Sequence, residues 1–132
     1  MILKTALVCL ALNIYHEARG EGMMGKYAVA HVVMNRVEHE RFPDTVCDVI
    51  TQRRNNRLHQ CQFSWYCDGR SDTPHDKDAW AEAQLIARDV LNEETDDITH
   101  GALFYHAHYV SPFWAEEFTQ TVVYGTHIFY TY

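Results

Sequence analysis

Residues 6–22 read ALVCLALNIYHEARGEG and contain the pattern from which the fold is predicted. Apolar side chains recur with the i, i+3, i+4, i+7 spacing of a helix with one buried face, at Leu3, Ala6, Leu7, Leu10 and Ile14. Gly20 and Gly22 interrupt this pattern, and either glycine can end a helix in the left-handed conformation. The segment therefore predicts an N-terminal helix that ends in a short polar stretch.

The same segment has features of a short secretory signal. Met1, Lys4 and the apolar stretch 6–12 supply a positive charge followed by an apolar run. No small-x-small cleavage pattern follows, and the run continues directly into the polar residues 13–17. We therefore expect a structural helix, and no clear signal peptide in the chain as written.

Length and composition favour a single domain over residues 1–132. Hydrophobic residues make up 47% and charged residues 22%, which excludes an intrinsically disordered chain. No run of about 18 apolar residues is present, so no membrane span is expected. The net charge of -7 disfavours nucleic acid as a partner, because affinity for nucleic acid depends on Lys and Arg. We expect a monomer without a cofactor.

The rest of the chain predicts helices first and strands last. Helices are expected at about 24–38, 44–50 and 76–91, with a long polar loop at 52–73. Strands are expected at 102–106, 118–124 and 127–132, with Gly125 and Thr126 in a hairpin turn. The predicted fold class is α+β, helix-dominated, with a small antiparallel β-sheet near the C-terminus.

Four cysteines allow three pairings, which the sequence does not distinguish. Cys9 lies in the apolar helix and is interpreted as a small core residue. A disulfide among Cys47, Cys61 and Cys67 would staple a loop in an oxidising compartment.

Two acidic residues at the end of the first helix are candidates for acid–base chemistry. Burial of Glu17 would raise its pKa, as a general acid near neutral pH requires, whereas the nearby cation Arg19 would lower it. The alternative is that both are ordinary surface charges at a helix end. Glu21 follows four residues after Glu17.

Histidines and aromatic residues give weaker signals. His106 and His108 share one face of a strand and, with His127, could bind zinc, or His106 and His127 could line a groove. Tyr and Trp rings suit sugar binding, and Asn35, Arg36 and Gln62 offer donors for sugar hydroxyls. We expect no metal, because no C-x-x-C pair or carboxylate partner completes the histidine pattern.

Six sequence blocks carry a family resemblance. They are 15–21, 28–37, 42–43, 62–65, 101–107 and 127–130, of which Glu17-Ala18-Arg19-Gly20-Glu21 is the most specific. In this order they resemble the catalytic domain of the spore cortex-lytic enzyme type of cell-wall hydrolase, over nearly the whole chain. The resemblance implies a lysozyme-like fold related to lytic transglycosylases, with peptidoglycan glycan strands as the partner.

The resemblance also implies a mechanism and a set of site residues. Glu17 corresponds to the catalytic glutamate, which would cleave the MurNAc–GlcNAc bond as a single acid/base and leave a 1,6-anhydro product. The alternatives are a hydrolytic muramidase assisted by Glu21, or a zinc amidase that uses the three histidines. The residues expected to bind substrate are Tyr15, Asn35, Gln62, Phe63, Tyr105, His106, Trp114, His127 and Tyr130.

The place of action follows from the same resemblance. It implies the bacterial cell wall, at its periplasmic or extracellular face. Many spore members carry a separate N-terminal peptidoglycan-binding domain, and this sequence shows none. We therefore expect a stand-alone lysis enzyme, such as a phage endolysin released by a holin.

Overall fold

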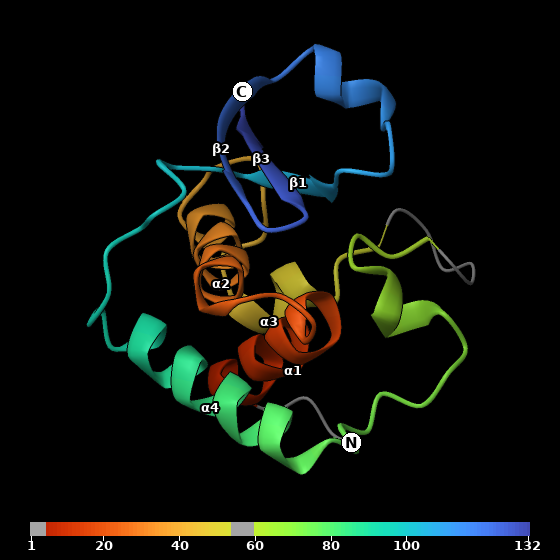
Figure 1. The fold of residues 1–132 in the computed structure, drawn as a ribbon, viewed down its shortest axis with the longest axis vertical. Coiled ribbons are helices and arrows are strands. Elements are labelled where there is room, and N and C mark those ends of the chain that lie inside the picture. The colour runs from red at the N-terminus through yellow and green to blue at the C-terminus, as the bar shows by residue number, and fades with distance from the viewer. Residues whose placement is uncertain (1–4, 54–59) are drawn as a thin grey trace.

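The computed structural model describes residues 5–53 and 60–132. In chain order the elements are α1 (Ala6–Ala18), α2 (Met23–Val37), α3 (Val46–Ile50), the 3-10 helix η1 (Ser64–Cys67), α4 (Lys77–Leu91), β1 (Phe104–Ala107), the 3-10 helix η2 (Phe113–Glu116), β2 (Thr119–Tyr124) and β3 (His127–Thr131). Figure 1 shows the four α-helices packed together, with the three strands gathered at one end. The predicted α+β, helix-dominated class is confirmed.

Helix α1 lies at the centre of the helical part, where it packs against α2, α3 and α4. Thr5 caps its first turn by accepting a hydrogen bond of 3.2 Å from the Val8 N–H. Every residue from Cys9 to Tyr15 is buried, so this part of the helix is enclosed on all sides and not only on the predicted face. The helix ends at Ala18. Leu3, which the spacing placed on this helix, lies outside the described residues.

The other α-helices begin close to their predicted positions, and polar side chains cap two of them, α3 and α4. The Thr45 hydroxyl and the Asp76 carboxylate each accept a backbone N–H from the first turn of α3 and α4. Part of the predicted loop at 52–73 forms the short helix η1. Across residues 5–53 and 60–132, no helix combines the length and apolarity needed to cross a bilayer.

The sheet is antiparallel, with strand order β1-β3-β2. Strands β2 and β3 form the predicted hairpin, whose turn contains Gly125 at a φ of 57°, a conformation that favours glycine. Strand β1 begins at Phe104, two residues later than predicted, because the Ala102 N–H bonds to the Thr99 hydroxyl and not to a neighbouring strand. The sheet therefore starts directly after a side-chain-stabilised turn.

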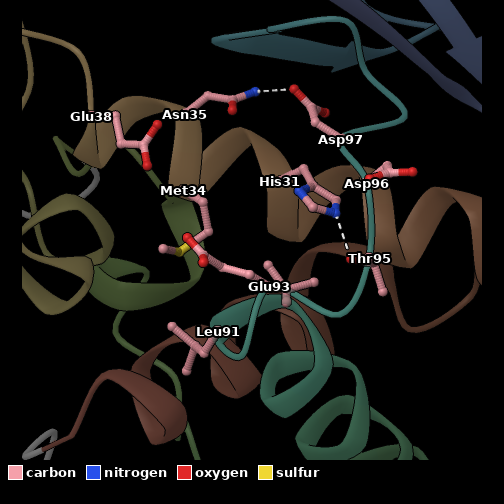
Figure 2. Close-up of a pocket in the computed structure, with 10 residues that line it drawn as sticks. His31, Met34, Asn35, Glu38, Leu91, Glu93, Thr95, Asp96 and Asp97 are labelled. Carbon is pink, nitrogen blue, oxygen red and sulfur yellow. Dashed lines mark hydrogen bonds between the residues drawn. The ribbon is translucent and has the colours of Figure 1, made fainter.

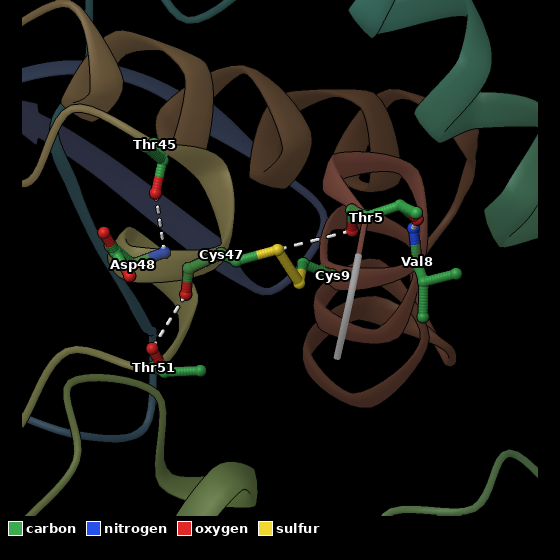
Figure 3. The surroundings of a disulfide bond; sticks show 7 residues. All are labelled: Thr5, Val8, Cys9, Thr45, Cys47, Asp48 and Thr51. Atoms are coloured by element: carbon green, nitrogen blue, oxygen red, sulfur yellow. Dashed lines mark hydrogen bonds between the residues drawn. A yellow bond between two sulfur atoms is a disulfide. The ribbon is translucent and has the colours of Figure 1, made fainter. Parts of the chain in front are cut away.

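Both disulfides support the helical part. Cys9 was interpreted as a small core residue, and it is fully buried. It is also bonded to Cys47, a partner that was expected to pair with Cys61 or Cys67, because α1 and α3 bring the Cα atoms of Cys9 and Cys47 to 5.3 Å. Figure 3 shows this bond beside the capping residues of both helices. The second disulfide joins Cys61 to Cys67, the last residue of η1, and so encloses this short helix, as one of the predicted pairings allowed.

The two disulfides should contribute unequally to stability. In the chain-entropy description, the 38-residue separation of Cys9 and Cys47 corresponds to about 4 kcal/mol, and the 6-residue separation of Cys61 and Cys67 to about 2 kcal/mol. We expect the double substitution Cys9→Ala/Cys47→Ala to lower the free energy of unfolding by more than Cys61→Ala/Cys67→Ala. Urea unfolding without reductant measures both, and the reverse order would contradict this account.

Candidate functional site

The carboxyl of Glu17 lies in the last turn of α1, where this helix meets the sheet. The residue is half-buried, and its Oε1 accepts a hydrogen bond of 2.5 Å from the hydroxyl of Tyr105 on β1. These two residues are 88 positions apart in the chain, and both were predicted as site residues. The fold thus brings one predicted residue from the helices and one from the sheet into direct contact.

Burial dominates the electrostatics of this pair. Loss of water disfavours the carboxylate and raises the pKa of Glu17, although the Tyr105 hydrogen bond and the charge of Arg36 both act to lower that pKa. Burial also raises the pKa of Tyr105 well above its usual value, so this hydroxyl remains a donor at neutral pH. The pKa of Glu17 is therefore shifted in the direction that general acid–base catalysis by a carboxyl requires.

The cation that acts on Glu17 is Arg36 of α2, and not Arg19 as the sequence suggested. Arg36 is only 3% exposed, and its Nε donates to the Leu103 carbonyl at 2.7 Å. Burial lowers its pKa to about 10, so it remains charged at neutral pH. Its guanidinium carbon lies 5.0–5.6 Å from the ring centroids of Phe42, Phe63 and Phe104. Arg19 instead donates to the Tyr15 hydroxyl.

Glu21, the predicted assisting carboxyl, is bound to the β2–β3 hairpin. Its Oε1 accepts from both the backbone N–H and the hydroxyl of Thr126, each at 2.9 Å, and Nδ1 of His127 lies 3.6 Å away. A Cβ added at Gly125 would lie only 2.8 Å from this oxygen. Because α1 ends at Ala18, the helical i, i+4 geometry does not relate Glu21 to Glu17.

Three other predicted residues pack against one another beside the sheet: His106 on β1, Trp114 in η2 and Tyr130 on β3. Nδ1 of His106 lies 2.7 Å from the Ala107 carbonyl, which can only accept, so Nδ1 carries the proton and Nε2 accepts from the Tyr130 hydroxyl at 2.8 Å. The His106 and Tyr130 rings stack with centroids 5.3 Å apart, and Trp114 packs edge-on against both. Rings with polar edges of this kind suit sugars.

Other predicted residues are dispersed around α1. Tyr15 is buried, and its hydroxyl accepts the backbone N–H of Asp76, which ties the start of α4 to α1. Phe63 is buried against Arg36, whereas its neighbour Gln62 is exposed. Of these predicted residues, only Gln62 presents its side chain to solvent.

Asn35 lies in a pocket of about 340 Å³ between α2 and the segment that follows α4 (Figure 2). Its Nδ2 donates to the Asp97 carboxylate at 2.9 Å and to the Ala102 carbonyl at 3.0 Å. The amide thereby holds the segment that leads into β1. The structure therefore gives Asn35 a supporting role, with its donors already used.

The three histidines of the zinc alternative do not gather at one point. Nε2 of His106 is bonded to Tyr130, His108 is exposed, and His127 is buried beside Glu21. Within residues 5–53 and 60–132, no group of three His, Cys, Asp or Glu side chains is arranged to hold a metal ion. The histidine spacing on one strand face was thus insufficient to predict a shared site.

Two buried polar residues near Glu17, Asn13 and Arg36, were not predicted to act on it. Asn13 is fully buried one turn earlier on α1, and a polar amide inside an apolar helix, four residues before an acid, was a usable signal. Arg36 was considered only as a donor for sugars. No local pattern indicates that three aromatic rings cover it.

Comparison with known proteins gives consistent matches. Residues 20–130 match the family described as Cell Wall Hydrolase. The chain is 34% identical over 98 residues to a spore cortex-lytic enzyme of Oceanobacillus iheyensis, covering 73% of this chain and 30% of that protein. It is 33% identical over 96 residues to that of Halalkalibacterium halodurans, covering 73% and 25%. The chain therefore spans less than a third of the length of these two relatives.

Two solved structures match almost the whole chain. The catalytic domain of the germination-specific lytic transglycosylase SleB from Bacillus anthracis is 30% identical, with a TM-score of 0.76, covering 98% of this chain and 97% of that one. The catalytic domain of the Bacillus cereus SleB protein is 31% identical, with a TM-score of 0.74, covering 96% and 89%. These matches agree with the observed order of helices and strands.

The hairpin contacts of Glu21 predict a role in stability. Glu21→Ala removes the acceptor of two hydrogen bonds, and we expect the free energy of unfolding to fall by about 1.5–3 kcal/mol. Chemical denaturation at pH 7 measures this loss. The exposed Glu94 serves as a control, and Glu94→Ala should change stability by less than about 0.5 kcal/mol. Equal effects of the two substitutions would argue against a stabilising role for the bonds between Glu21 and the hairpin.

Proposed function

Because this chain belongs to the Cell Wall Hydrolase family, we propose that it is a lytic transglycosylase that cleaves the glycan strands of peptidoglycan. The Bacillus anthracis relative is a lytic transglycosylase, which supports this reaction, and the spore cortex-lytic relatives support the cell wall as the place of action. One observation carries the proposal for this chain. Glu17 is a half-buried carboxyl with a raised pKa, in contact with a fixed hydroxyl donor.

Glu17 acts first as the general acid. Its proton passes to the oxygen of the glycosidic bond between MurNAc and GlcNAc as the bond from this oxygen to C1 of MurNAc breaks. The leaving GlcNAc thereby gains a hydroxyl, and an oxocarbenium-like centre develops at C1. The raised pKa of Glu17 increases the fraction of the carboxyl that is protonated at a given pH, which favours its role as an acid.

Glu17 then acts as the base. Its carboxylate takes the proton of the MurNAc 6-hydroxyl while that oxygen bonds to C1, which gives the 1,6-anhydro product and returns Glu17 to its protonated form. Water is not consumed. Tyr105 and Arg36 stabilise the carboxylate between the two steps, through the hydrogen bond at Oε1 and a buried positive charge.

Three ring-bearing residues, His106, Trp114 and Tyr130, are proposed to hold the sugar rings, together with the exposed amide of Gln62. The imidazole and phenol are fixed by their mutual hydrogen bond and stacking, so little side-chain freedom is lost when a sugar binds. Polar edges and apolar faces match the two surfaces of a pyranose ring.

A muramidase assisted by Glu21 is less well supported. Such an enzyme needs a second carboxylate that activates water or stabilises the cation. The Oε1 of Glu21 already accepts two hydrogen bonds from Thr126 in the hairpin. The zinc amidase is also less well supported, since His106, His108 and His127 are held in three different environments.

Replacement of Glu17 tests the proposal directly. Glu17→Gln keeps the size of the side chain and an acceptor for Tyr105 but removes the titrating proton, so we expect glycan cleavage to fall by about 10²–10⁴-fold. Release of muropeptides from purified sacculi measures activity. Mass spectrometry should find wild-type products lighter than reducing muropeptides by one water, without effect of a chelator.

Glu94→Gln is the matched control, because this residue is exposed and should leave activity unchanged. Full activity of Glu17→Gln would remove the proposed catalytic acid. Hydrated products would favour the muramidase, and new amino termini that disappear with a chelator would favour the amidase.

The Tyr105 hydrogen bond predicts a shift in the pH profile. This bond lowers the pKa of Glu17, so Tyr105→Phe raises that pKa and keeps the acid protonated to higher pH. Since kcat/KM depends on protonated Glu17, we expect its alkaline limb to move upward by about one pH unit. Initial rates at low sacculus concentration across pH 5–9 measure the limb, and a downward shift would contradict the assigned role.

A further inference from the structure

The disulfide between Cys61 and Cys67 encloses a short segment that packs against the catalytic helix and its surroundings. We call residues 61–67 the stapled segment. Within it, Phe63 and Trp65 are buried, whereas Gln62 is exposed. The two buried rings therefore turn inward from a segment whose ends are joined covalently.

Trp65 holds the end of α1 from one side. Its Nε1 donates a hydrogen bond of 2.8 Å to Oδ1 of Asn13, an amide that is fully buried one turn before Glu17. Its ring also stacks on His16, with centroids 4.7 Å apart, and His16 directly precedes Glu17 in the chain. Loss of Trp65 from this position would remove a packed neighbour and a buried hydrogen bond next to the candidate acid.

Phe63 contributes to the same site through Arg36. Its ring centroid lies 5.2 Å from the guanidinium carbon of Arg36, the buried cation that acts on Glu17. Water that entered in place of this ring would screen the charge of Arg36 and weaken its effect on the carboxylate. The stapled segment thus supports both the helix that carries Glu17 and the cation that stabilises it.

Little regular structure holds the stapled segment apart from its disulfide. Between α3 and α4, the described residues form only η1 and a single bridge between Arg53 and Cys61. The backbone N–H of Gln62 adds one hydrogen bond, of 2.9 Å, to the carbonyl of Gln52. Segments with so few backbone bonds open locally at low cost, so a covalent closure has a large effect on how often this segment is in place.

We propose that the Cys61–Cys67 disulfide is a redox switch for the catalytic site. The inference rests on the proposed function of Glu17. In the reduced form the stapled segment opens, Trp65 leaves α1, Phe63 leaves Arg36, and glycan cleavage slows. Oxidation of the two thiols closes the segment and restores the site.

The switching step is a thiol–disulfide exchange with a low-molecular-mass disulfide as the oxidant. The thiolate of one cysteine attacks this disulfide and releases one thiol, and the thiolate of the other then attacks the mixed disulfide and releases the second. Cys61 and Cys67 together give up two protons and two electrons, and one S–S bond forms between them. A thiol reductant reverses the exchange. Because the cytoplasm keeps thiols reduced and extracytoplasmic compartments do not, activity would increase where peptidoglycan lies.

The variant Cys9→Ala/Cys47→Ala isolates the switch, because Cys61 and Cys67 are then the only cysteines. We expect it to release muropeptides from sacculi about tenfold faster when oxidised than after treatment with dithiothreitol. The matched control is Cys61→Ala/Cys67→Ala, which should be slow under both conditions. This control also shows whether the reductant affects the sacculi. Far-UV circular dichroism at the assay temperature establishes that each variant is folded.

Two results would overturn the proposal. One is an equal rate of Cys9→Ala/Cys47→Ala with and without dithiothreitol. The other is a rate of oxidised Cys61→Ala/Cys67→Ala equal to that of the wild type, a comparison that stands even if the first variant does not fold. Inactivity of Glu17→Gln with either result would retain the proposed function and reject only the switch. Full activity of Glu17→Gln with the tenfold redox effect would reject the proposed acid instead.

The indole N–H of Trp65 reports directly on the closed segment. In a 15N-labelled sample of the wild-type protein, its signal should exchange with D2O faster after reduction, while the indole signal of Trp80 on α4 keeps its rate. Unchanged exchange at Trp65 would overturn the proposal. Equal acceleration at both indoles would indicate general unfolding and would overturn it as well.

Discussion

The contact between Tyr105 and Glu17 is the interaction on which the rest of the site depends, because it joins the sheet to the central helix at the buried carboxyl. A carboxylate removed from water is unfavourable unless donors or cations compensate. The same short stretch of chain provides both, since Tyr105 donates to Glu17 and the Leu103 carbonyl fixes Arg36. Docking of β1 thus sets the hydrogen bond and the charge that act on Glu17 together.

Two carboxyls four residues apart lie in different environments because the chain turns between them. Glu17 ends a helix in a place where burial raises its pKa. Glu21 lies beyond the turn and accepts hydrogen bonds from the backbone N–H and the hydroxyl of Thr126 in the hairpin. Glu17 and Glu21 are close in the sequence, but α1 ends at Ala18, between them. This ending separates Glu17, which is proposed to transfer protons, from Glu21, which is bonded to the hairpin of the sheet.

Features that depend on neighbouring residues could be predicted from the sequence. The apolar spacing before Glu17 and the turn at Gly125 both act over a few residues, and the structure has each of them. Features that depend on which surfaces meet could not. Cys9 pairs with a cysteine 38 residues away, and Asn35 donates to a carboxylate 62 residues away.

The support of α1 is consistent with the proposal that the Glu17 carboxyl serves as both acid and base. A group that gives and then takes a proton must stay within hydrogen-bond distance of both reacting oxygens, with its position held to within about 0.5 Å of the productive geometry. Helix α1 is bonded to α3 through Cys9, to η1 through Asn13 and to the start of α4 through Tyr15. These three attachments lie at successive points along the helix before Glu17, and Tyr105 holds the carboxyl itself. Fixed at these points, the helix positions Glu17 without a contribution from Glu21.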